Sequence, residues 1–483
     1  MIAQARPALP VTVGVSLVLG ALLSNAATFA PVGTEYPPAG LLLGDQVYPA
    51  VSLTSQGGWV VWQDNAGDAD GSAISARKLS SGFAGTGNVI HVNQTTKGNQ
   101  ENASVSALSD GGAFVVWQGG EQGGQDIYAR LLRPDGLFAG NEILLNTYTY
   151  AQQKNPEVAL LTTGQIVVIW SSYGQDGSME GIYAQRLTLA GAKVGSEFRV
   201  NQTTPFNQRS PSIAALDNGG FVVAWISEQN RFENSVDVYA RTFNFAGNPV
   251  GGEILVNSSS NLCATPIVRG TSSGGFVTSW TERNLATLQN HWQIMARTYS
   301  GSFTSPAKQI SIDSTGDRTS PRIAGSRDGL MVVWTSQGQD GSREGVFGRF
   351  LTSTGEAVGT EFQVNTYAES IQFHPALASD GAKQFMVVWS SFVGGSTTFD
   401  LLGQLYGAKT LTPNVTFRRA SQSQLRIEWS TEAGTSYQIQ SSTDISSTPF
   451  TDVGPARLAT GTSDFILMDQ SAGAGFYRIK VIP

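Results

Sequence analysis

Short runs of apolar residues alternate with polar turns along most of the chain, and the runs recur at intervals of roughly 50 residues. In each copy, an apolar run after a proline leads through a glycine-bearing turn to a β-branched and aromatic run that ends in tryptophan. A polar loop follows, and then two more strand-like runs, for example residues 127–130 and 253–257. Such runs, bounded by turn residues, predict four antiparallel strands per copy.

Seven tryptophans mark the copies and are separated by 55, 53, 55, 55, 54 and 55 residues: Trp62, Trp117, Trp170, Trp225, Trp280, Trp334 and Trp389. A repeat of this length with several strands per copy predicts a β-propeller, because one small sheet cannot bury both faces until neighbouring sheets pack on it. The sequence therefore predicts an all-β fold with a seven-bladed β-propeller. Because every copy has one tryptophan, we expect these side chains to pack between adjacent sheets.

Two polar positions recur in the same register. An asparagine ends the fourth strand of five copies: Asn93, Asn146, Asn201, Asn257 and Asn365. A long polar residue occupies the third strand of every copy: Arg77, Arg130, Gln185, Arg241, Arg297, Arg349 and Gln404. We expect the asparagine amides to satisfy backbone groups of turns, and the long side chains to bridge neighbouring blades.

The two ends of the repeat region predict how the ring closes. The third strand of the last copy, residues 399–407, is followed by no fourth strand. Residues 39–47 lie just before the first proline strand, in the register of a fourth strand. We therefore expect residues 39–47 to complete the last blade, so that no strand edge is left open. Truncation before residue 48 is predicted to destabilise the ring.

The N-terminus has the features of a secretory signal peptide over residues 1–26. One arginine precedes an apolar run of 13 residues, Val11–Leu23, and small residues end at Ala26, where cleavage is expected. The apolar run is too short to span a bilayer, so membrane insertion is not expected. The mature protein is predicted to be secreted, with a cell-surface location as an alternative.

Two predicted domains follow the signal peptide. Residues 27–408 form the propeller, and residues 411–483 alternate apolar and polar positions as in a small β-sandwich with Trp429 in its core. Charged residues make up only 14% of the chain, and the formal net charge is −7. Because no basic run is present, nucleic acid is excluded as a partner. A monomer is expected.

The repeat resembles a family of secreted and surface bacterial proteins, through the strings GGFVV-x-W, GQDGS-x-EG and EF-x-VN at about residues 48–407. That resemblance implies a seven-bladed ring outside the cell, and it implies no catalytic residues. The C-terminal stretch, with FYRIKV at residues 476–481, resembles a module of secreted bacterial proteins that is loosely similar to fibronectin type III. The module is attached to many kinds of partner, so it implies no activity.

The polar loops before the first strands and after the second strands are predicted to converge on one face, where a ligand site is expected. Two loops on that face place oxygen atoms at alternate positions, and a third has two aspartates: Asp176, Ser178 and Glu180; Asp340, Ser342 and Glu344; Asp68 and Asp70. Oxygen ligands in a glycine-containing turn suit calcium, so these are candidate metal ligands. The same residues are also ordinary turn formers.

No recognisable catalytic motif accompanies these loops. The three histidines, His91, His291 and His374, fall at different places in the repeat, and no pair has metal-binding spacing. The sequence therefore predicts a secreted, non-catalytic binding or adhesion protein for an extracellular glycan or protein. Two alternatives remain: a polysaccharide-acting hydrolase or lyase whose residues converge at the centre of the ring, and a purely structural surface protein.

Overall fold

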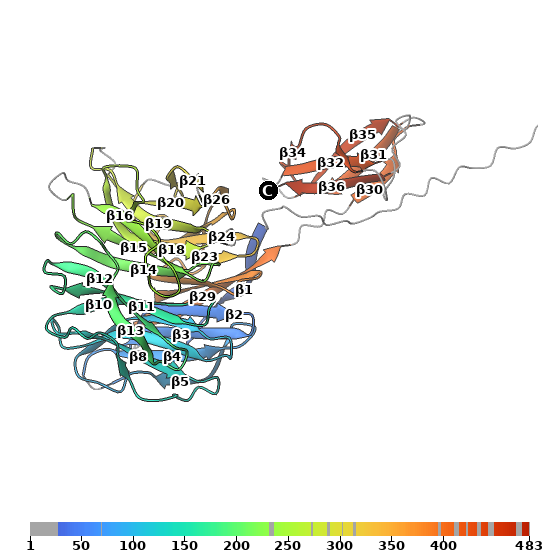
Figure 1. Ribbon diagram of the computed structural model, residues 1–483. Helices are drawn as coiled ribbons and strands as arrows, with labels where there is room; N and C mark the ends of the chain where they lie inside the picture. The colour runs from blue at the N-terminus through green and yellow to red at the C-terminus, as the bar shows by residue number, and fades with distance from the viewer. Residues whose placement is uncertain are drawn as a thin grey trace, which may run out of the picture. The chain divides into compact units, whose positions relative to one another are not determined.

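The computed structural model describes residues 28–482 except residues 69, 231–235, 272–273, 287–289, 302, 313–314, 395–397, 410–414, 422–423, 432–435, 443–448 and 470–475. The predicted signal peptide, residues 1–26, lies outside the described residues. Phe29–Ala408 forms one compact unit, and Lys409–Pro483 belongs to a second (Figure 1). Every regular element described is a β-strand, which confirms the predicted all-β class. Within the described ranges, no helix is long and apolar enough to cross a membrane.

Seven antiparallel sheets make up the unit Phe29–Ala408 in the described part of the chain. Their first strands are β2 (Gln46–Thr54), β6 (Asn99–Ala107), β10 (Gln153–Leu160), β14 (Gln208–Ala215), β18 (Leu262–Gly270), β23 (Arg318–Ser326) and β27 (Gln372–Ser379). The second strands, which end at or just beyond the repeated tryptophans, are β3 (Gly57–Asp64), β7 (Ala113–Gly120), β11 (Ile166–Tyr173), β15 (Phe221–Ser227), β19 (Phe276–Arg283), β24 (Gly329–Gln337) and β28 (Gln384–Phe392).

The third strands are β4 (Ala73–Leu79), β8 (Asp126–Leu132), β12 (Glu180–Leu187), β16 (Asp237–Phe243), β20 (Gln293–Ser300), β25 (Glu344–Leu351) and β29 (Phe399–Lys409). The fourth position is taken by β5 (Gly85–His91), β9 (Ile143–Leu144), β13 (Lys193–Arg199), β17 (Ile254–Leu255), β21 (Phe303–Thr304) with β22 (Lys308–Gln309), β26 (Ala357–Gln363) and β1 (Thr28–Tyr36). Because successive strands are antiparallel, the connections before each first strand and after each second strand lie at the same end of the sheet. We call this the loop end.

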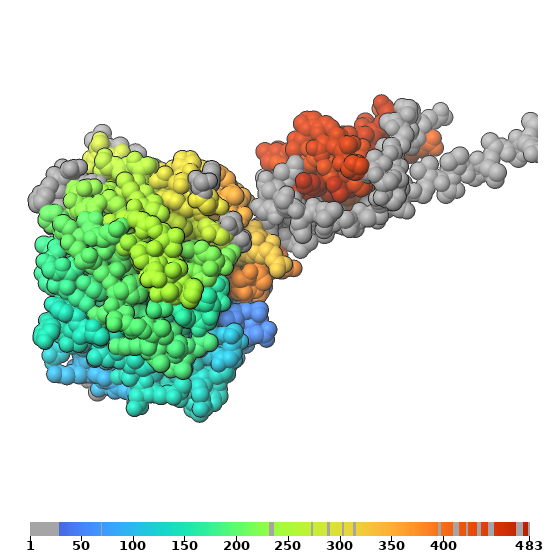
Figure 2. Space-filling model, viewed as in Figure 1, coloured from blue at the N-terminus to red at the C-terminus, as the bar shows by residue number. Residues whose placement is uncertain are grey.

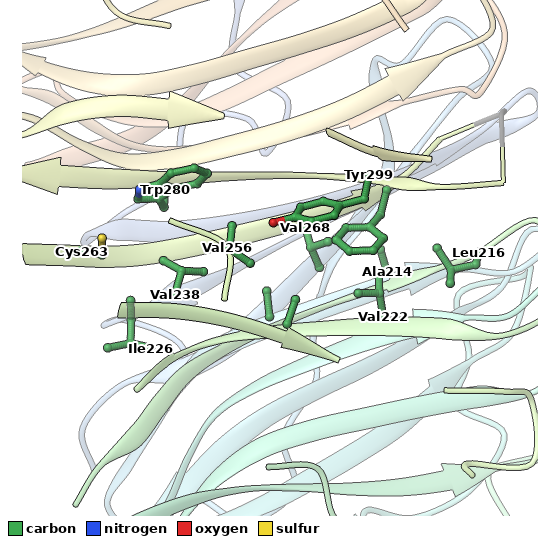
Figure 3. Close-up of a cluster of buried hydrophobic side chains, with 13 residues drawn as sticks. Ala214, Leu216, Val222, Ile226, Val238, Val256, Cys263, Val268, Trp280 and Tyr299 are labelled. Atoms are coloured by element: carbon green, nitrogen blue, oxygen red, sulfur yellow. The ribbon is translucent and has the colours of Figure 1, made fainter. Parts of the chain in front are cut away.

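Apolar side chains of neighbouring sheets pack into a separate cluster at each contact, and the space-filling view shows consecutive coloured segments of Phe29–Ala408 lying side by side (Figure 2). The cluster between the sheets of β15 and β19 contains Val222, Ile226, Val268 and Trp280 (Figure 3). Each of the seven repeated tryptophans belongs to one such cluster and is at most 1% exposed. The prediction that these tryptophans pack between sheets is confirmed.

Two repeated hydrogen bonds reinforce the contacts. Each recurring asparagine accepts a bond from a backbone N–H of the third strand of its own sheet, as Asn146 does from Ile127 at 2.7 Å. The third-strand arginines donate to a backbone carbonyl of the preceding sheet, as Arg130 does to Val92 at 2.7 Å. The expected roles of the asparagines and of the arginines are confirmed. Gln185 and Gln404 donate within their own sheets instead.

The strand beside β29 is β1, and not the predicted residues 39–47. Residues 39–45 lie outside any strand, and only the last two residues of 39–47 belong to β2. Residues 32–36 read VGTEY, which matches VGTEF at residues 358–362 in β26, the corresponding strand of another sheet. The Glu35 carboxylate accepts a bond from the Thr366 backbone N–H at 2.8 Å, as Glu361 does from Ile312 at 2.7 Å. The N-terminal segment does supply the missing strand, but it does so about ten residues earlier than predicted.

The second unit contains two antiparallel sheets. One is ordered β30 (Val415–Arg419), β31 (Gln424–Ser430) and β35 (Ser463–Asp469), and the other joins β32 (Ser436–Ser442) to β33 (Thr451–Asp452), β34 (Arg457–Leu458) and β36 (Phe476–Ile482). Trp429 and Ile439 are buried together in its core. Trp429 is therefore the core aromatic, as predicted.

Candidate functional site

Each first strand contains a two-residue β-bulge opposite the tryptophan of the second strand. In β10, the register jumps from the pair Lys154–Ser171 to the pair Glu157–Ile169, so that two residues of β10 face Trp170 alone. The same jump recurs in the other six first strands. Bulges bend a strand, re-aim a side chain and are common beside functional sites. The bulge is therefore a candidate position for a site.

The leading residue of each bulge has a left-handed backbone. The angle φ lies between 45° and 53° at all seven positions, which are Tyr48, Asn102, Asn155, Ser210, Thr265, Ser320 and His374. None is glycine, although an L side chain rarely adopts this conformation and holding it costs on the order of 1–3 kcal/mol. Every one of the seven side chains carries a polar atom. We call them the bulge residues.

Bulge residues of neighbouring sheets touch one another. Asn102 donates a hydrogen bond from Nδ2 to Oδ1 of Asn155 at 3.3 Å. The rings of Tyr48 and His374, from β2 and β27, have centroids 4.4 Å apart with an interplanar angle of 40°. The second contact joins side chains from opposite ends of the repeat region. Two pairs of bulge residues thus meet across neighbouring sheets.

Charged side chains lie two positions after two of the bulge residues, Asn155 and Ser320. Glu157 in β10 accepts a hydrogen bond from Ser104 Oγ at 2.9 Å. Burial raises the pKa of Glu157, while attraction to Arg322 and the bond from Ser104 oppose this shift. Burial lowers the pKa of Arg322 in β23, and Glu157 opposes that shift in turn. The carboxylate and the guanidinium therefore share one polar region although their strands belong to different sheets.

His374 lies between the ring of Tyr48 and the ring of Phe373, whose centroid is 4.6 Å away. Its backbone N–H donates to Oγ1 of Thr335 at 3.2 Å, which helps to hold the left-handed backbone. Burial, with a smaller contribution from the Arg322 guanidinium, lowers the pKa of His374 to about 4. The imidazole is therefore neutral at pH 7 and has a ring nitrogen that can accept a proton.

Tyr48, Glu157, Arg322 and His374 together make what we call the first-strand cluster. The phenol of Tyr48 is 41% exposed and can donate a proton to a bound molecule. A guanidinium binds a carboxylate or a sulfate through two parallel hydrogen bonds. The cluster thus offers a proton acceptor, a proton donor and an anion-binding group in one place. That combination suits acid–base chemistry on an anionic ligand.

Reasoning from sequence missed this cluster, since His374 was grouped with the isolated histidines. A signal was present: six of the seven bulge residues directly precede a proline, as Tyr48 and His374 do. The proline marks the same register in six copies. Comparing the residue before it across those copies would have placed six of the seven side chains, Tyr48 and His374 among them, at one level.

The predicted calcium ligands are held in turns. Asp176 Oδ1 accepts a bond from the Ser178 backbone N–H at 3.1 Å, and Asp340 Oδ1 accepts one from Ser342 at the same distance. Glu180 is largely buried and forms an ion pair with Lys154 at 2.9 Å. The ammonium of Lys154 thus takes one of the oxygens that a cation would use.

In the first loop, Asp176 Oδ2 and Glu180 Oε2 are buried without a hydrogen-bond partner among the described residues, whereas the aspartates of the other two candidate loops accept further hydrogen bonds. Asp340 Oδ2 accepts a bond from Asn365 Nδ2 at 3.3 Å, and Asp68 Oδ2 accepts one from Asn93 at 3.2 Å. Asp70 Oδ2 accepts a bond from a backbone N–H at 3.2 Å. Glu344 begins β25. Among the residues that the structure describes, no three His, Cys, Asp or Glu side chains gather closely enough to hold a metal ion. Calcium binding at these loops stays a prediction.

A thermal scan with and without calcium tests these loops. We expect millimolar calcium, or a chelator, to move the melting temperature by less than about 2 °C, because a weak site adds only RT ln(1 + [L]/Kd) to the stability. Lys154→Ala would free the Glu180 oxygen, and this variant should gain more from calcium than the wild type does. A rise of about 5 °C or more in the wild type would contradict this expectation and support the calcium site.

Comparison with known proteins places the fold. A scan against protein-family models gives no match, and neither does a search of the curated proteins. Among solved structures, a polysaccharide lyase of family PL25, an ulvan lyase, is similar with a TM-score of 0.51 and 10% identity, over 79% of this chain and 96% of its own. A PL25 ulvan lyase bound to -[GlcA(1-4)Rha3S]- gives a TM-score of 0.50 with the same identity and coverage.

A third similar structure is an α-L-arabinanase of Penicillium chrysogenum complexed with arabinobiose, with a TM-score of 0.43 and 16% identity over 65% of this chain and 94% of its own. The likeness to the lyases confirms the β-propeller-like fold. It also corrects the predicted function. We expected a non-catalytic binding or adhesion protein, whereas the two similar structures with TM-scores of 0.50 and 0.51 are polysaccharide lyases. Of the predicted functions, the alternative of a hydrolase or lyase agrees better with these neighbours.

Proposed function

We propose that this protein cleaves an acidic polysaccharide by β-elimination in the first-strand cluster. The observation that carries the proposal is the contact between a neutral imidazole, His374, and an exposed phenol, Tyr48, with Arg322 close enough to affect the imidazole. Support comes from the ulvan lyase of similar fold, which binds an oligosaccharide that contains glucuronic acid. The substrate of this chain is proposed to be a uronic-acid polymer of the same chemical class.

Each side chain has a defined task in this reaction. Arg322 binds the uronate carboxylate and stabilises the negative charge that develops there. Neutral His374 takes the proton from C5, and the electron pair left behind forms the C4=C5 double bond as the C4–O bond breaks. Tyr48 donates its proton to the departing oxygen, and the proton now on His374 then passes to the phenolate, directly or through water, so that both side chains return to their starting forms. The products are one unsaturated uronate end and one new sugar end.

The arrangement of carboxylates favours a lyase over a hydrolase. Glycoside hydrolysis normally requires two carboxyl groups, one on each side of the scissile bond. At the bulge positions and two residues beyond them, all of which the structure describes, Glu157 is the one carboxylate. Its hydrogen bond to Ser104 and its attraction to Arg322 give it a positioning role for the guanidinium.

We also propose that the seven sheets form a closed, seven-bladed ring. Three contacts between the first and last sheets support closure. Strand β1 pairs with β29, Arg77 donates to the Ala39 carbonyl at 2.8 Å, and Trp62 packs in one cluster with Val388. First strands also contact one another in order from β2 through β27 and back to β2. In a closed ring, the first-strand cluster lines the loop end of the central channel.

We also propose that the protein is secreted and that its signal peptide and C-terminal module have the boundaries predicted from the sequence. The signal peptide over residues 1–26 and the C-terminal module over residues 411–483 rest on the sequence features described above. An exported enzyme would meet a polysaccharide outside the cell, and the acidic surface without basic runs suits an extracellular setting. Expression of the full chain with and without residues 1–26, followed by fractionation, tests the export signal.

The enzyme assay uses residues 27–483 with soluble uronic-acid polysaccharides, with and without sulfate, and with a neutral polysaccharide as control. We expect ultraviolet absorbance from C4=C5 bonds to grow in step with new reducing ends on the acidic polymers alone. New reducing ends without the absorbance would identify a hydrolase and contradict β-elimination. Neither product from any acidic polymer would contradict the proposed function.

A further inference from the structure

A group of three tyrosines, two exposed and one half-buried, lies at the loop end beside β10 and is not part of the first-strand cluster. Tyr148 and Tyr150 lie in the connection between β9 and β10, and their ring centroids are 5.7 Å apart in an edge-on arrangement. Tyr150 is 91% exposed. Tyr173, the last residue of β11, is 51% exposed. Large aromatic side chains this open to solvent commonly mark binding surfaces.

The three tyrosines are brought together by contacts between their two connections. The backbone N–H of Tyr173 donates to the Gln152 carbonyl at 3.0 Å. A Cβ atom added at Gly174 would lie 3.6 Å from the Tyr148 hydroxyl, so the phenol of Tyr148 rests against the chain that follows Tyr173. We call Tyr148, Tyr150 and Tyr173 the tyrosine platform.

The backbone beneath the tyrosine platform is fixed by side chains of the neighbouring strands. Asn146 donates from Nδ2 to the Tyr148 carbonyl at 3.0 Å, and Glu197 accepts from the Thr147 backbone N–H at 2.7 Å. Gln152 donates to Gln125 Oε1 at 2.9 Å. A loop held in this way loses little conformational entropy when a ligand binds. Tyrosine itself has few rotatable bonds, which adds to the same advantage.

Resting on the proposed function, we infer that the tyrosine platform is an outer subsite that binds a neutral sugar unit of the same polysaccharide chain. The apolar face of a sugar ring can stack on a tyrosine ring, while phenol hydroxyls bond to sugar hydroxyls. The surroundings suit a neutral unit. Asp176 and Glu197 lie in the surrounding loops and strand together with Arg199 and Lys193, so the charges there are mixed, and the tyrosine side chains themselves carry none. Acidic units therefore belong at Arg322, and a neutral unit belongs at the tyrosine platform.

The tests use Tyr150→Ala and Tyr173→Ala in residues 27–483. The matched control is Tyr367→Ala: Tyr367 follows Asn365-Thr366 as Tyr148 follows Asn146-Thr147, it is 41% exposed, and it belongs to a different connection. Retention is measured by electrophoresis through gels that contain the best polymeric substrate, in a His374→Ala background that prevents cleavage. Cleavage is measured on the polymer and on its shortest cleavable oligosaccharide.

We expect Tyr150→Ala and Tyr173→Ala each to weaken polymer binding and raise KM for the polymer roughly 10-fold, in line with the usual strength of aromatic stacking. Turnover of the shortest oligosaccharide and all properties of Tyr367→Ala should match the parent protein. Unchanged polymer KM in an active protein overturns the subsite and leaves the proposed function standing. An equal loss in Tyr367→Ala also overturns it. If the unmodified protein neither retains nor cleaves any polymer, both proposals fall.

Discussion

Deletion of residues 28–36 is expected to destabilise the unit Phe29–Ala408 by more than about 4 kcal/mol, at the upper end of what small changes cause. Strand β1 runs beside β29, and without it β29 becomes an open edge with unpaired backbone groups. Phe29 packs on the rings of Phe350 and Phe385, with centroids 5.1 and 4.9 Å away, and these would be exposed to water. Tyr36 also donates from its hydroxyl to the Phe83 carbonyl at 2.9 Å.

Thermal and urea unfolding of residues 27–483 and residues 37–483 measure this effect. We expect the melting temperature to fall by about 10 °C or more. Phe29→Ala should give a smaller loss of about 3 kcal/mol, because it creates a cavity without opening the edge of β29. A synthetic peptide of residues 28–40 added to the shortened protein should restore part of the lost stability. Equal melting temperatures for the two lengths would show that β1 does not hold the unit together.

The repeated positions were predictable because the same packing problem is solved in every sheet. A tryptophan between two sheets, such as Trp170, and an arginine that reaches the preceding sheet, such as Arg130, must recur with the period of the fold. Periodicity in the sequence is direct information about such contacts. The roles of these residues were therefore correctly inferred before the structure was known.

The closing strand was misplaced because the motif that identifies a fourth strand is incomplete in β1. Fourth strands such as β26 are followed by Val364 and Asn365, whereas Tyr36 is followed by two prolines. The match between residues 32–36 and residues 358–362 was still present. Arg77 donates to the backbone carbonyl of Ala39. In contrast to Val92 and Val200 in other copies, Ala39 is not followed by an asparagine. The backbone carbonyl therefore plays the same role here as in the other copies, although the side-chain motif is absent.

The first-strand cluster was harder to predict, because only the proline after Tyr48 and His374 recurs between copies, whereas the cluster residues themselves differ. Tyr48 and His374 occupy equivalent positions of two copies that meet only when the first and last sheets come together. Glu157 and Arg322 interact across sheets that lie far apart in sequence. The left-handed backbone at the bulge is also invisible in the sequence, because none of these residues is glycine. The recurring proline marks the position of such a site, but side chains that differ between copies give no periodic signal of their chemistry.

His374→Ala and Tyr48→Phe are each expected to reduce kcat on an acidic polysaccharide by about 100- to 10,000-fold, the usual contribution of a positioned acid or base. Tyr48→Phe keeps the ring that packs on His374 and removes only the hydroxyl, so its loss reports proton transfer. His291→Ala is the matched control, since His291 lies outside the cluster and contacts Asp317 at 3.3 Å. Equal loss in His291→Ala, or full activity of either cluster variant, would contradict the assigned roles.

The pH dependence separates catalysis from structure. Because the pKa of His374 is lowered to about 4, the imidazole stays neutral down to that pH, and the acid limb of kcat/KM should lie near pH 4 instead of 6.5. Arg322→Gln removes one cause of this shift, so the acid limb should move to higher pH in a variant that keeps some activity.

The stability of the fold should also depend on the protonation of His374. As the pH falls from 6.5 towards 4, the unfolded chain binds a proton that folded His374 does not, so the free energy of unfolding decreases over that range. His374→Ala should remove this part of the decrease, and an unchanged pH profile of stability would show that His374 is not held neutral in the folded protein.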